Sequence, residues 1–378
     1  EDKIYGDFTR ETDVMFEKSM KSARMKGFLS AVTTLATSAA LAIVLWKGGM
    51  IAAEEVGTFS LFMTYARGLM EPVNILVESL SLFIAGKVNI ERYSKLIETV
   101  PTVQDTADVT EKYGTGFDPR KENWEELKGD IEFKDVDFKY PDGDDYVLRN
   151  FSLKIPFGTN LAIVGETGAG KSTLVNLICR FYEPVKGQVL IDGKDARERS
   201  QLWLQSSLGY VLQTPHLFSG TVRDNLIYGK PDAADDQIME ALDMVCARDI
   251  IEKLDKGLDS DVGEGGDMLS TGEKQLISFA RAILAKPRIL VLDEATASVD
   301  TLTEQRIQSA IDTIIQGRTS LVVAHRLSTV KNADLILVVK AGKIIEQGTH
   351  RELMAKKGYY HRLYTRQYED EATGAILA

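Results

Sequence analysis

The chain has 378 residues, which is enough for two or three folded domains. Its formal net charge of −11 argues against a general nucleic-acid-binding protein, because such proteins carry an excess of Lys and Arg. The two cysteines, Cys179 and Cys246, have no metal-ligand spacing and lie in apolar helical patterns. This predicts buried, reduced thiols and not a disulfide scaffold.

The first hydrophobic segment is an uncharged run over residues 28–46, and about 20 apolar residues suffice to cross a hydrocarbon core. Lys and Arg side chains between residues 18 and 26 precede the run, whereas Glu54 and Glu55 follow it. This asymmetry predicts that the N-terminal end faces the cytoplasm. We therefore expect a membrane helix at about residues 28–52, with the helix-compatible residues 3–26 as its cytoplasmic extension.

A second, less apolar segment runs over residues 56–88. It contains three charged residues, Arg67, Glu71 and Glu78. Charged side chains at membrane depth usually face a helix bundle or an aqueous cavity, and Pro72 predicts a kink. Residues 1–95 are therefore expected to form a partial transmembrane domain with two membrane helices, and the alternative is a soluble helical hairpin. Two helices are too few to enclose a solute pathway, so we expect a fragment or a partner that supplies further helices.

Residues 96–128 are expected to form a linker. Pro101 opens a polar stretch with little apolar periodicity, and glycines interrupt it further. Trp124 and Leu127 are expected to dock the end of the linker onto the next domain, which covers residues 129–378.

This domain begins with a segment, residues 131–140, in which apolar and polar residues nearly alternate. The pattern predicts an edge-type antiparallel strand. Short apolar runs predict further strands, at about residues 151–155, 161–164, 188–191, 207–213, 289–294 and 320–324. From about residue 221 to residue 285 the pattern is helical and is interrupted by glycines between residues 263 and 266.

The most specific motif is Gly-Glu-Thr-Gly-Ala-Gly-Lys-Ser at residues 165–172. It matches the phosphate-loop pattern, and an apolar strand before it and a helical segment from Ser172 to Phe181 flank it as required. The glycines allow backbone N–H groups to converge on a phosphate, and the helix N-terminus adds partial positive charge. Lys171 would reach the β- and γ-phosphates, and the Ser172 hydroxyl would bind Mg²⁺. The motif therefore predicts a nucleotide site.

Two later strands end in polar residues of the kind that this chemistry needs. The run over residues 289–292 is followed by Asp293 and Glu294, and ligands bind at the carboxyl ends of strands in open α/β sheets. Asp293 would organise the Mg²⁺ shell, and Glu294 would polarise a water for in-line attack on the γ-phosphate. His325 follows the strand at residues 320–324 at the same edge, which predicts a γ-phosphate contact.

Together these motifs resemble those of an ABC transporter of the exporter type, in the family's order and over nearly the whole chain. The resemblance implies the last two membrane helices of one half-transporter, followed by a complete nucleotide-binding domain. It implies an α/β P-loop ATPase domain with an antiparallel β subdomain and an α-helical subdomain that carries the signature motif. The implied activity is ATP hydrolysis coupled to outward transport of a drug, a lipid or a peptide.

The resemblance also implies which residues serve ATP and Mg²⁺. The catalytic residues are Glu294, His325 and Lys171, and the Mg²⁺ ligands are Ser172, Gln213 and Asp293. Tyr140 matches the aromatic residue that stacks on adenine, and Gln213 matches the glutamine that senses the membrane domain. The full set of implied nucleotide contacts is Tyr140, Gly165, Glu166, Thr167, Gly168, Ala169, Gly170, Lys171, Ser172, Thr173, Gln213, Ser270, Gly272 and Asp300.

The signature motif departs from the family's usual Leu-Ser-Gly-Gly-Gln, because residues 269–273 read Leu-Ser-Thr-Gly-Glu. The family forms head-to-tail ATPase dimers, so Ser270 and Gly272 would contact a nucleotide held by the partner. Glu273 places a carboxylate near this anionic ligand, which is unfavourable unless Lys274 offsets it. Because altered signatures occur in asymmetric exporters, the expected partner is a second half-transporter, with a heterodimer favoured over a homodimer.

Two further segments resemble family loops: residues 221–225 match the loop that contacts the intracellular coupling helices, and residues 298–300 match the D-loop. The expected location is the plasma membrane, in contact with lipid and with the ATPase domain in the cytoplasm. No nucleic-acid partner is expected. The alternatives are a weakly hydrolysing regulatory half-transporter and a soluble ABC ATPase of the DNA-repair or translation type, against which the run over residues 28–46 argues.

Overall fold

The computed structural model describes residues 2–51, 56–68, 70–293, 301–323 and 330–366. The chain divides into two compact units, Glu1–Val100 and Pro101–Ala378. The boundary falls inside the stretch in which we expected a linker.

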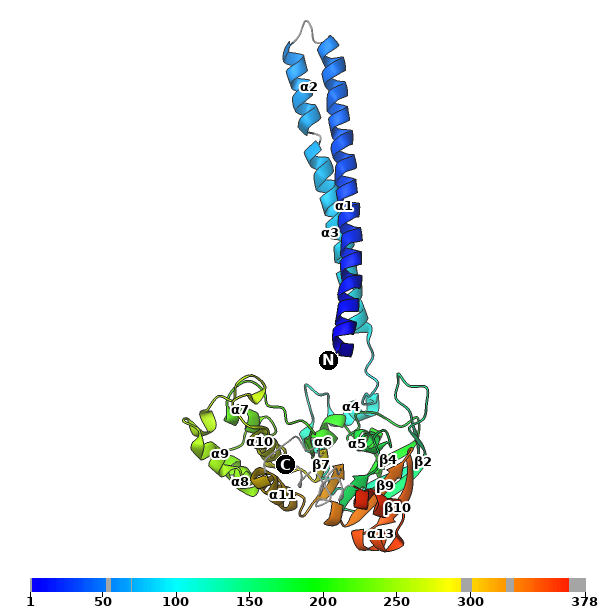
Figure 1. Cartoon of the computed structure of the whole chain (residues 1–378), viewed down its shortest axis with the longest axis vertical. Helices are drawn as coiled ribbons and strands as arrows, with labels where there is room; N and C mark the ends of the chain where they lie inside the picture. Colours follow the sequence, from blue (N-terminus) through cyan, green and yellow to red (C-terminus); the bar gives the residue numbers. More distant parts are fainter. Residues whose placement is uncertain (1, 52–55, 69, 294–300, 324–329, 367–378) are drawn as a thin grey trace. The chain divides into compact units, whose positions relative to one another are not determined.

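The first unit is helical and consists of α1 (Asp2–Ile51), α2 (Val56–Gly68) and α3 (Met70–Glu98) (Figure 1). α1 continues through the apolar run without interruption and contacts α2. Among the described residues one helical stretch, Thr12–Met50, is long and apolar enough to cross a membrane. Its large apolar side chains are exposed, with Phe28 at 71%, Leu35 at 70% and Trp46 at 70% of their full exposure. Such a surface suits contact with lipid or with further helices more than contact with water.

The second hydrophobic segment, in which we expected one kinked helix over residues 56–88, is described as α2, which ends at Gly68, and α3, which begins at Met70. Residue 69 lies outside the described residues. Pro72, at which we expected the kink, lies near the start of α3.

The second unit contains two sheets. The six-stranded sheet has the order β10-β9-β3-β8-β7-β6, and its strands are parallel except that β10 runs antiparallel to β9. Its strands are β3 (Asn160–Val164), β6 (Leu208–Val211), β7 (Ile289–Asp293), β8 (Thr319–Val323), β9 (Leu335–Lys340) and β10 (Lys343–Gly348). The four-stranded antiparallel sheet has the order β2-β1-β4-β5 and consists of β1 (Ile131–Phe138), β2 (Leu148–Ile155), β4 (Lys186–Ile191) and β5 (Lys194–Asp195).

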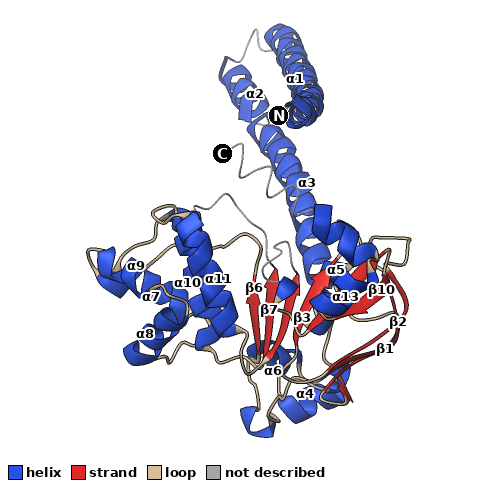
Figure 2. Cartoon of the chain, turned by 60° about the horizontal axis from the view of Figure 1, so that its bottom comes forward, coloured by secondary structure: helices blue, strands red, loops and turns tan. Residues whose placement is uncertain are grey.

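α10 and α11 cover one face of the six-stranded sheet and α5 covers the other. α7, α8 and α9 lie on the β6 side of this unit (Figure 2). The α-helices of this unit are α4 (Ala107–Tyr113), α5 (Lys171–Ile178), α6 (Gln201–Ser206), α7 (Val222–Ile227), α8 (Asp235–Met244), α9 (Arg248–Lys253), α10 (Thr271–Leu284), α11 (Thr301–Ile314) and α13 (His350–Lys356). Short 3₁₀ helices are η1 (Lys121–Asn123), η2 (Ala196–Glu198), η3 (Gly257–Asp259) and η4 (Glu264–Gly266).

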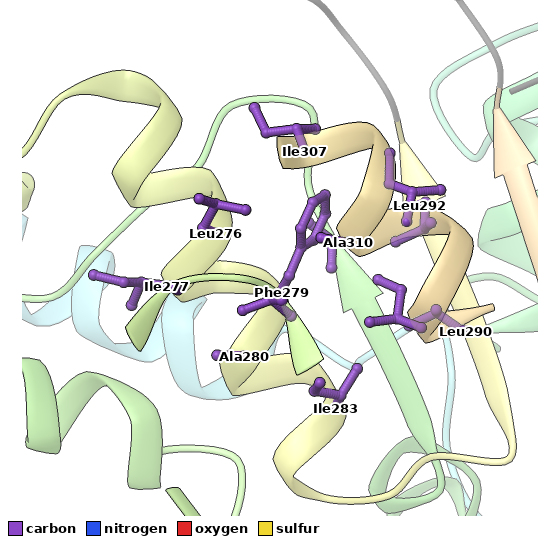
Figure 3. Packing of buried hydrophobic residues seen from close by; sticks show 14 of the residues in the cluster. Leu276, Ile277, Phe279, Ala280, Ile283, Leu290, Leu292, Ile307 and Ala310 are labelled. Carbon is purple, nitrogen blue, oxygen red and sulfur yellow. The ribbon is translucent and has the colours of Figure 1, made fainter. Parts of the chain in front are cut away.

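Two hydrophobic cores lie on opposite faces of the six-stranded sheet. On one face, Leu290 and Leu292 of β7 pack with the apolar sides of α10 and α11, including Phe279 (Figure 3). On the other face, Ile289 and Val291 of the same strand join a core shared with the antiparallel sheet and α5. Burial on both faces explains why residues 289–292 of β7 are all apolar. The strand ends at Asp293, which is only partly buried.

The expectation that β1 is an edge strand is wrong. β1 pairs with β2 on one side and with β4 on the other, so it lies inside the antiparallel sheet. The alternation reflects one buried face and one more exposed face, a pattern that interior strands of antiparallel sheets share with edge strands.

One of the two cysteines also differs from the expectation. Cys179 is buried, and burial raises the pKa of its thiol to about 12. Cys246 is exposed, because it lies past the end of α8 in a turn with a positive φ of 54° and not on an apolar helix face.

Residues 101–128 belong to the second unit. The expected docking of Trp124 and Leu127 is borne out, because Leu127 is buried and Trp124 packs against the same core.

Polar groups that are distant in the sequence also hold residues 101–128. Arg180 is 1% exposed, and its Nη1 donates to Asp105 Oδ1 at 2.8 Å. Asp105 also accepts from the Gln201 backbone N–H at 3.1 Å. Val109 and Tyr113 on α4 are buried. The segment that the composition presents as a connector is therefore packed structure, because its partners lie beyond residue 180.

Glu125 extends this polar network. It accepts from Lys194 Nζ at 2.9 Å and from Arg199 Nη2 at 3.0 Å. The hydrogen bond from Lys194 holds the pKa of Glu125 at about 2, against the opposing effect of burial and with further help from Arg199. Trp203 Nε1 donates to the Glu125 carbonyl at 2.7 Å.

We predict that Glu125→Gln lowers the melting temperature at pH 7. The folded pKa of about 2 lies below the ordinary value of 4.5, so the ionised carboxylate stabilises the fold above pH 4.5 and loses this effect as the pH falls toward 2. The side chain is partly exposed, so we expect at most about 1 kcal/mol, or about 2–4 °C. Differential scanning calorimetry from pH 7 to pH 2 should show the two melting temperatures converging. Glu122→Gln, on the exposed Glu122 nearby, is the control, and an equal shift for both variants contradicts the prediction.

Candidate nucleotide-binding site

The phosphate loop connects β3, in the interior of the six-stranded sheet, to α5. Gly168 and Gly170 have φ values of 79° and 102°, in the left-handed region that favours glycine. Gly165 is required for another reason, because a Cβ there would collide with the backbone carbonyl oxygen of Val339 on β9. The Gly342 N–H donates to the Ala169 carbonyl at 3.0 Å. The turn between β9 and β10 is thus hydrogen-bonded to the phosphate loop.

Lys171 is buried at the start of α5, with 8% of its surface exposed. Its Nζ donates to the carbonyl oxygens of Gly165 at 2.7 Å and of Glu166 at 3.1 Å. Burial lowers the pKa of Lys171, and the Asp293 carboxylate opposes that change. An anion that enters the loop would compensate the buried ammonium better than two neutral carbonyls do.

A cavity of about 500 Å³ opens beside this loop. It gathers residues that are far apart in the sequence, namely Tyr140, Val147, Thr167, Gly168, Gly170, Lys171, Ser172, Thr173, Gln213, Asp293 and Val323. The cavity therefore combines a phosphate loop, an aromatic ring, an amide and a carboxylate. Gly165, Glu166 and Ala169 belong to the loop but do not line the cavity.

Tyr140 is held at the wall of this cavity by its surroundings. Its ring makes edge contacts with Phe138 at 5.0 Å and with Tyr182 at 5.1 Å between centroids. Its hydroxyl and Thr173 Oγ1 share a hydrogen bond of 3.1 Å. A flat aromatic face beside a phosphate loop is the surface on which a nucleotide base can stack.

The signature segment lies outside this cavity, at the start of α10. Ser270 caps the helix, and its backbone N–H and hydroxyl donate to Glu273 Oε2 at 2.9 and 2.8 Å. The Glu273 N–H donates back to Ser270 Oγ at 3.3 Å, which closes a capping box. Lys274, the residue considered as an offset for the Glu273 charge, donates from its Nζ to the Gly265 carbonyl at 3.3 Å. Glu273 thus has a local helix-capping function, which a glutamine at this position can also perform.

Three predicted site residues, Glu294, Asp300 and His325, lie outside the described residues. The sequence analysis missed Val147 and Val323, which line the cavity without any motif to mark them. Only their tertiary position beside the phosphate loop makes them part of the site.

Comparison with known proteins identifies the family. A family model described as ABC transporter matches residues 148–297, which include the phosphate loop, the signature segment and the acids after β7. The uncharacterised ABC transporter ATP-binding protein YfiC of Bacillus subtilis is 36% identical over 97% of this chain and 61% of its own length. This chain belongs to the ABC transporter family.

Other relatives of this ABC transporter chain carry names that refer to transport. An ATP-dependent lipid A-core flippase of Desulfotalea psychrophila is 38% identical over 95% of the chain and 61% of its own length. A probable multidrug resistance ATP-binding/permease protein of Bacillus subtilis, YheH, is 43% identical over 83% of the chain and 44% of its own length. A bacterial Atm1-family ABC exporter with ATP bound superposes with a TM-score of 0.69 and 33% identity, over 89% of this chain and 57% of that one. The chain thus spans about three fifths or less of these proteins.

A second hollow of about 150 Å³ lies beside the residues that flank Gln213. Its lining includes Leu212, Pro215, Phe218 and Arg281. The Asn225 amide donates to the Phe218 carbonyl at 2.9 Å, which places the segment that resembles the coupling-helix loop at this hollow. No sequence motif marked this hollow, since its residues come from β6, from the loop that follows it and from α10.

We predict that Gly165→Ala weakens ATP binding by about fivefold or more. The added methyl group would meet the Val339 carbonyl oxygen and displace the start of the phosphate loop. Overpacking of this kind costs about 1–3 kcal/mol, and about 1.4 kcal/mol corresponds to a factor of ten. Isothermal titration calorimetry with the full chain measures the affinity. Gly116→Ala is the control, because nothing lies within 4 Å of a Cβ there, and an unchanged affinity for Gly165→Ala would be evidence against this constraint.

Proposed function

We propose that the chain is the ATP-hydrolysing part of an ABC exporter that drives outward transport of a drug, a lipid or a peptide. One observation carries this proposal: a single cavity combines the phosphate loop with Tyr140, Gln213 and Asp293. ATP is the ligand that fits this combination, since it offers a stacking base at one end and a triphosphate at the other. The similarity to a lipid A-core flippase, to a probable multidrug resistance protein and to the structure of an ABC exporter supports the direction of transport.

The residues present also suit Mg²⁺. Ser172 and Asp293 line the same cavity and supply a hydroxyl and a carboxylate, and hard cations prefer such oxygen ligands. Gln213 adds an amide oxygen. Among the described residues no cluster of three or more His, Cys, Asp or Glu could hold a metal alone. This agrees with the way Mg²⁺ is usually bound, through one or two protein ligands together with substrate phosphates and water.

The protein's contribution to hydrolysis would be positioning and charge. Lys171 would exchange its two carbonyl contacts for phosphate oxygens. Glu294 would polarise the attacking water, and His325 would contact the γ-phosphate, as their places after two parallel strands suggest. Tyr140 would position the base of ATP, and Thr173 would position its phosphate end.

A second half-transporter would complete the protein. In a head-to-tail dimer, Ser270 and Gly272 would face a nucleotide held by the partner, and Asp300 would lie near the same interface. The exposed apolar surface of α1 would contact membrane lipid and the partner's helices. A heterodimer is favoured by the altered signature, and the plasma membrane, with the ATPase domain in the cytoplasm, is the proposed location.

The capping box favours one alternative, a regulatory half-transporter that contributes a weak signature to its partner. The Ser270 hydroxyl carries one proton, and that proton is donated to Glu273. To donate to a phosphate, the hydroxyl would have to break this bond, and the Glu273 carboxylate would repel the phosphate.

We predict that Glu294→Gln lowers ATP turnover by about a hundredfold or more, because a general base typically contributes that much. Turnover of the full-length transporter in lipid vesicles is the measurement, with ATP binding measured in parallel. Glu240→Gln, on the exposed Glu240 of α8, is the control and should leave turnover unchanged. Little change for Glu294→Gln would mean that the partner's site carries the turnover, and this chain would be the regulatory half.

We also predict that Glu273→Gln raises turnover at the partner's site. The substitution removes a negative charge near the phosphate and can keep the capping geometry, and a charge pair at about 4 Å in water amounts to about 1 kcal/mol, roughly a fivefold effect. Ser270→Ala is the contrasting variant, because it removes the cap and should lower both turnover and stability. Equal turnover of wild type and Glu273→Gln would show that the carboxylate does not limit the signature.

A further inference from the structure

The C-terminal segment contacts the first variable residue of the phosphate loop. The Tyr359 hydroxyl donates to Glu166 Oε1 at 2.6 Å, although the two residues are 193 positions apart. This bond raises the pKa of the Tyr359 hydroxyl, because the neutral tyrosine is the donor to a carboxylate. None of the family motifs includes Tyr359.

Tyr359 is itself firmly placed. Its backbone N–H donates to Glu346 Oε1 at 2.6 Å, and the next N–H, of Tyr360, donates to Glu346 Oε2 at 2.9 Å. Lys340 Nζ lies 4.9 Å from the centre of the Tyr359 ring, and the Arg362 guanidinium lies 5.8 Å from it. One carboxylate of β10 therefore fixes the backbone, while two cations flank the ring and contribute positive potential near Glu166.

The two ends of Glu166 face different surroundings. Its backbone carbonyl accepts from Lys171 Nζ at 3.1 Å, on the side where phosphate would bind. Its carboxylate accepts from Tyr359, and Glu166 is absent from the residues that line the nucleotide cavity. A free carboxylate on this loop could turn toward the triphosphate and repel it, because unit charges still interact by about 1 kcal/mol at 4 Å in water.

We propose that Tyr359 is a positioning residue for nucleotide binding, which holds the Glu166 carboxylate away from the phosphate site and thereby sets the affinity for ATP. The inference rests on the proposed function, because it concerns the same cavity. It makes the described segment after α13, residues 357–366, part of the nucleotide site, although none of these residues is among those that line the cavity.

The test compares four variants of the full chain in nonionic detergent, by isothermal titration calorimetry with Mg²⁺ and ATP. Tyr359→Phe removes only the hydroxyl and should raise the dissociation constant about threefold to tenfold, the effect of repulsion between the released Glu166 carboxylate and the triphosphate in water. Its melting temperature should stay within about 1 °C of wild type. Tyr364→Phe is the matched control, because the Tyr364 ring contacts His350 at 4.9 Å and Tyr360 at 5.9 Å within the same segment.

The decisive arm is suppression by Glu166→Gln. If Tyr359 acts by restraining a charge, Tyr359→Phe should change the affinity less than about twofold in the Glu166→Gln background, since no charge is left to restrain. The penalty in the Glu166 background should also shrink at 1 M salt, because screening weakens repulsion at exposed sites. A purely structural contact would show neither behaviour.

Three results would overturn the inference: an unchanged affinity for Tyr359→Phe, an equal loss for Tyr364→Phe, or an undiminished loss in the Glu166→Gln background. Each of these assumes that the wild-type chain binds ATP. If wild type shows no ATP binding, the proposed function fails as well, and the two failures are thereby distinguished.

Discussion

The close approach of β9 to the beginning of the phosphate loop is the constraint on which the nucleotide site depends. Gly165 leaves no room for a side chain against the Val339 carbonyl, and the Gly342 N–H is bonded to the Ala169 carbonyl at 3.0 Å. A Cβ at Gly342 would in turn collide with the Val147 carbonyl, which belongs to the connection between β1 and β2. Two sheets therefore meet at this loop, and that junction places Tyr140 and Val147 on the wall of the cavity.

A buried guanidinium ties the segment before the antiparallel sheet to the helix that follows the loop. Arg180 lies just beyond α5 and bonds Asp105, the Gln104 carbonyl and the Arg199 carbonyl, while Glu183 completes the set. A buried charge is tolerated only when such partners are present, so removing one would be costly. The consequence for function is that the stretch that follows the membrane-type helices is bonded directly to the end of the P-loop helix.

At the start of α10 the same side chain, Ser270, caps the helix and is proposed to contact a nucleotide. The Ser270–Glu273 capping box satisfies the orphan N–H groups of the helix start, which stabilises the helix. The same bonds occupy the hydroxyl that the resemblance assigns to a partner's nucleotide. The phosphate loop also carries an acidic residue close to the proposed phosphate site. There the Glu166 carboxylate accepts a hydrogen bond from Tyr359, which lies 193 positions later in the sequence.

Local patterns were sufficient for several features of this protein. The continuous helix through residues 28–46, the strand, glycine loop and helix around Lys171, and the apolar strand that ends at Asp293 each depend on neighbouring residues, so periodicity and motif spacing predict them. The interior position of β1, the exposure of Cys246, the contact of Asp105 with Arg180 and the contact of Lys274 with Gly265 were not predictable in this way. Each depends on residues brought together from distant parts of the chain, and a one-dimensional pattern does not record which strand lies beside which or where a long side chain finds its acceptor.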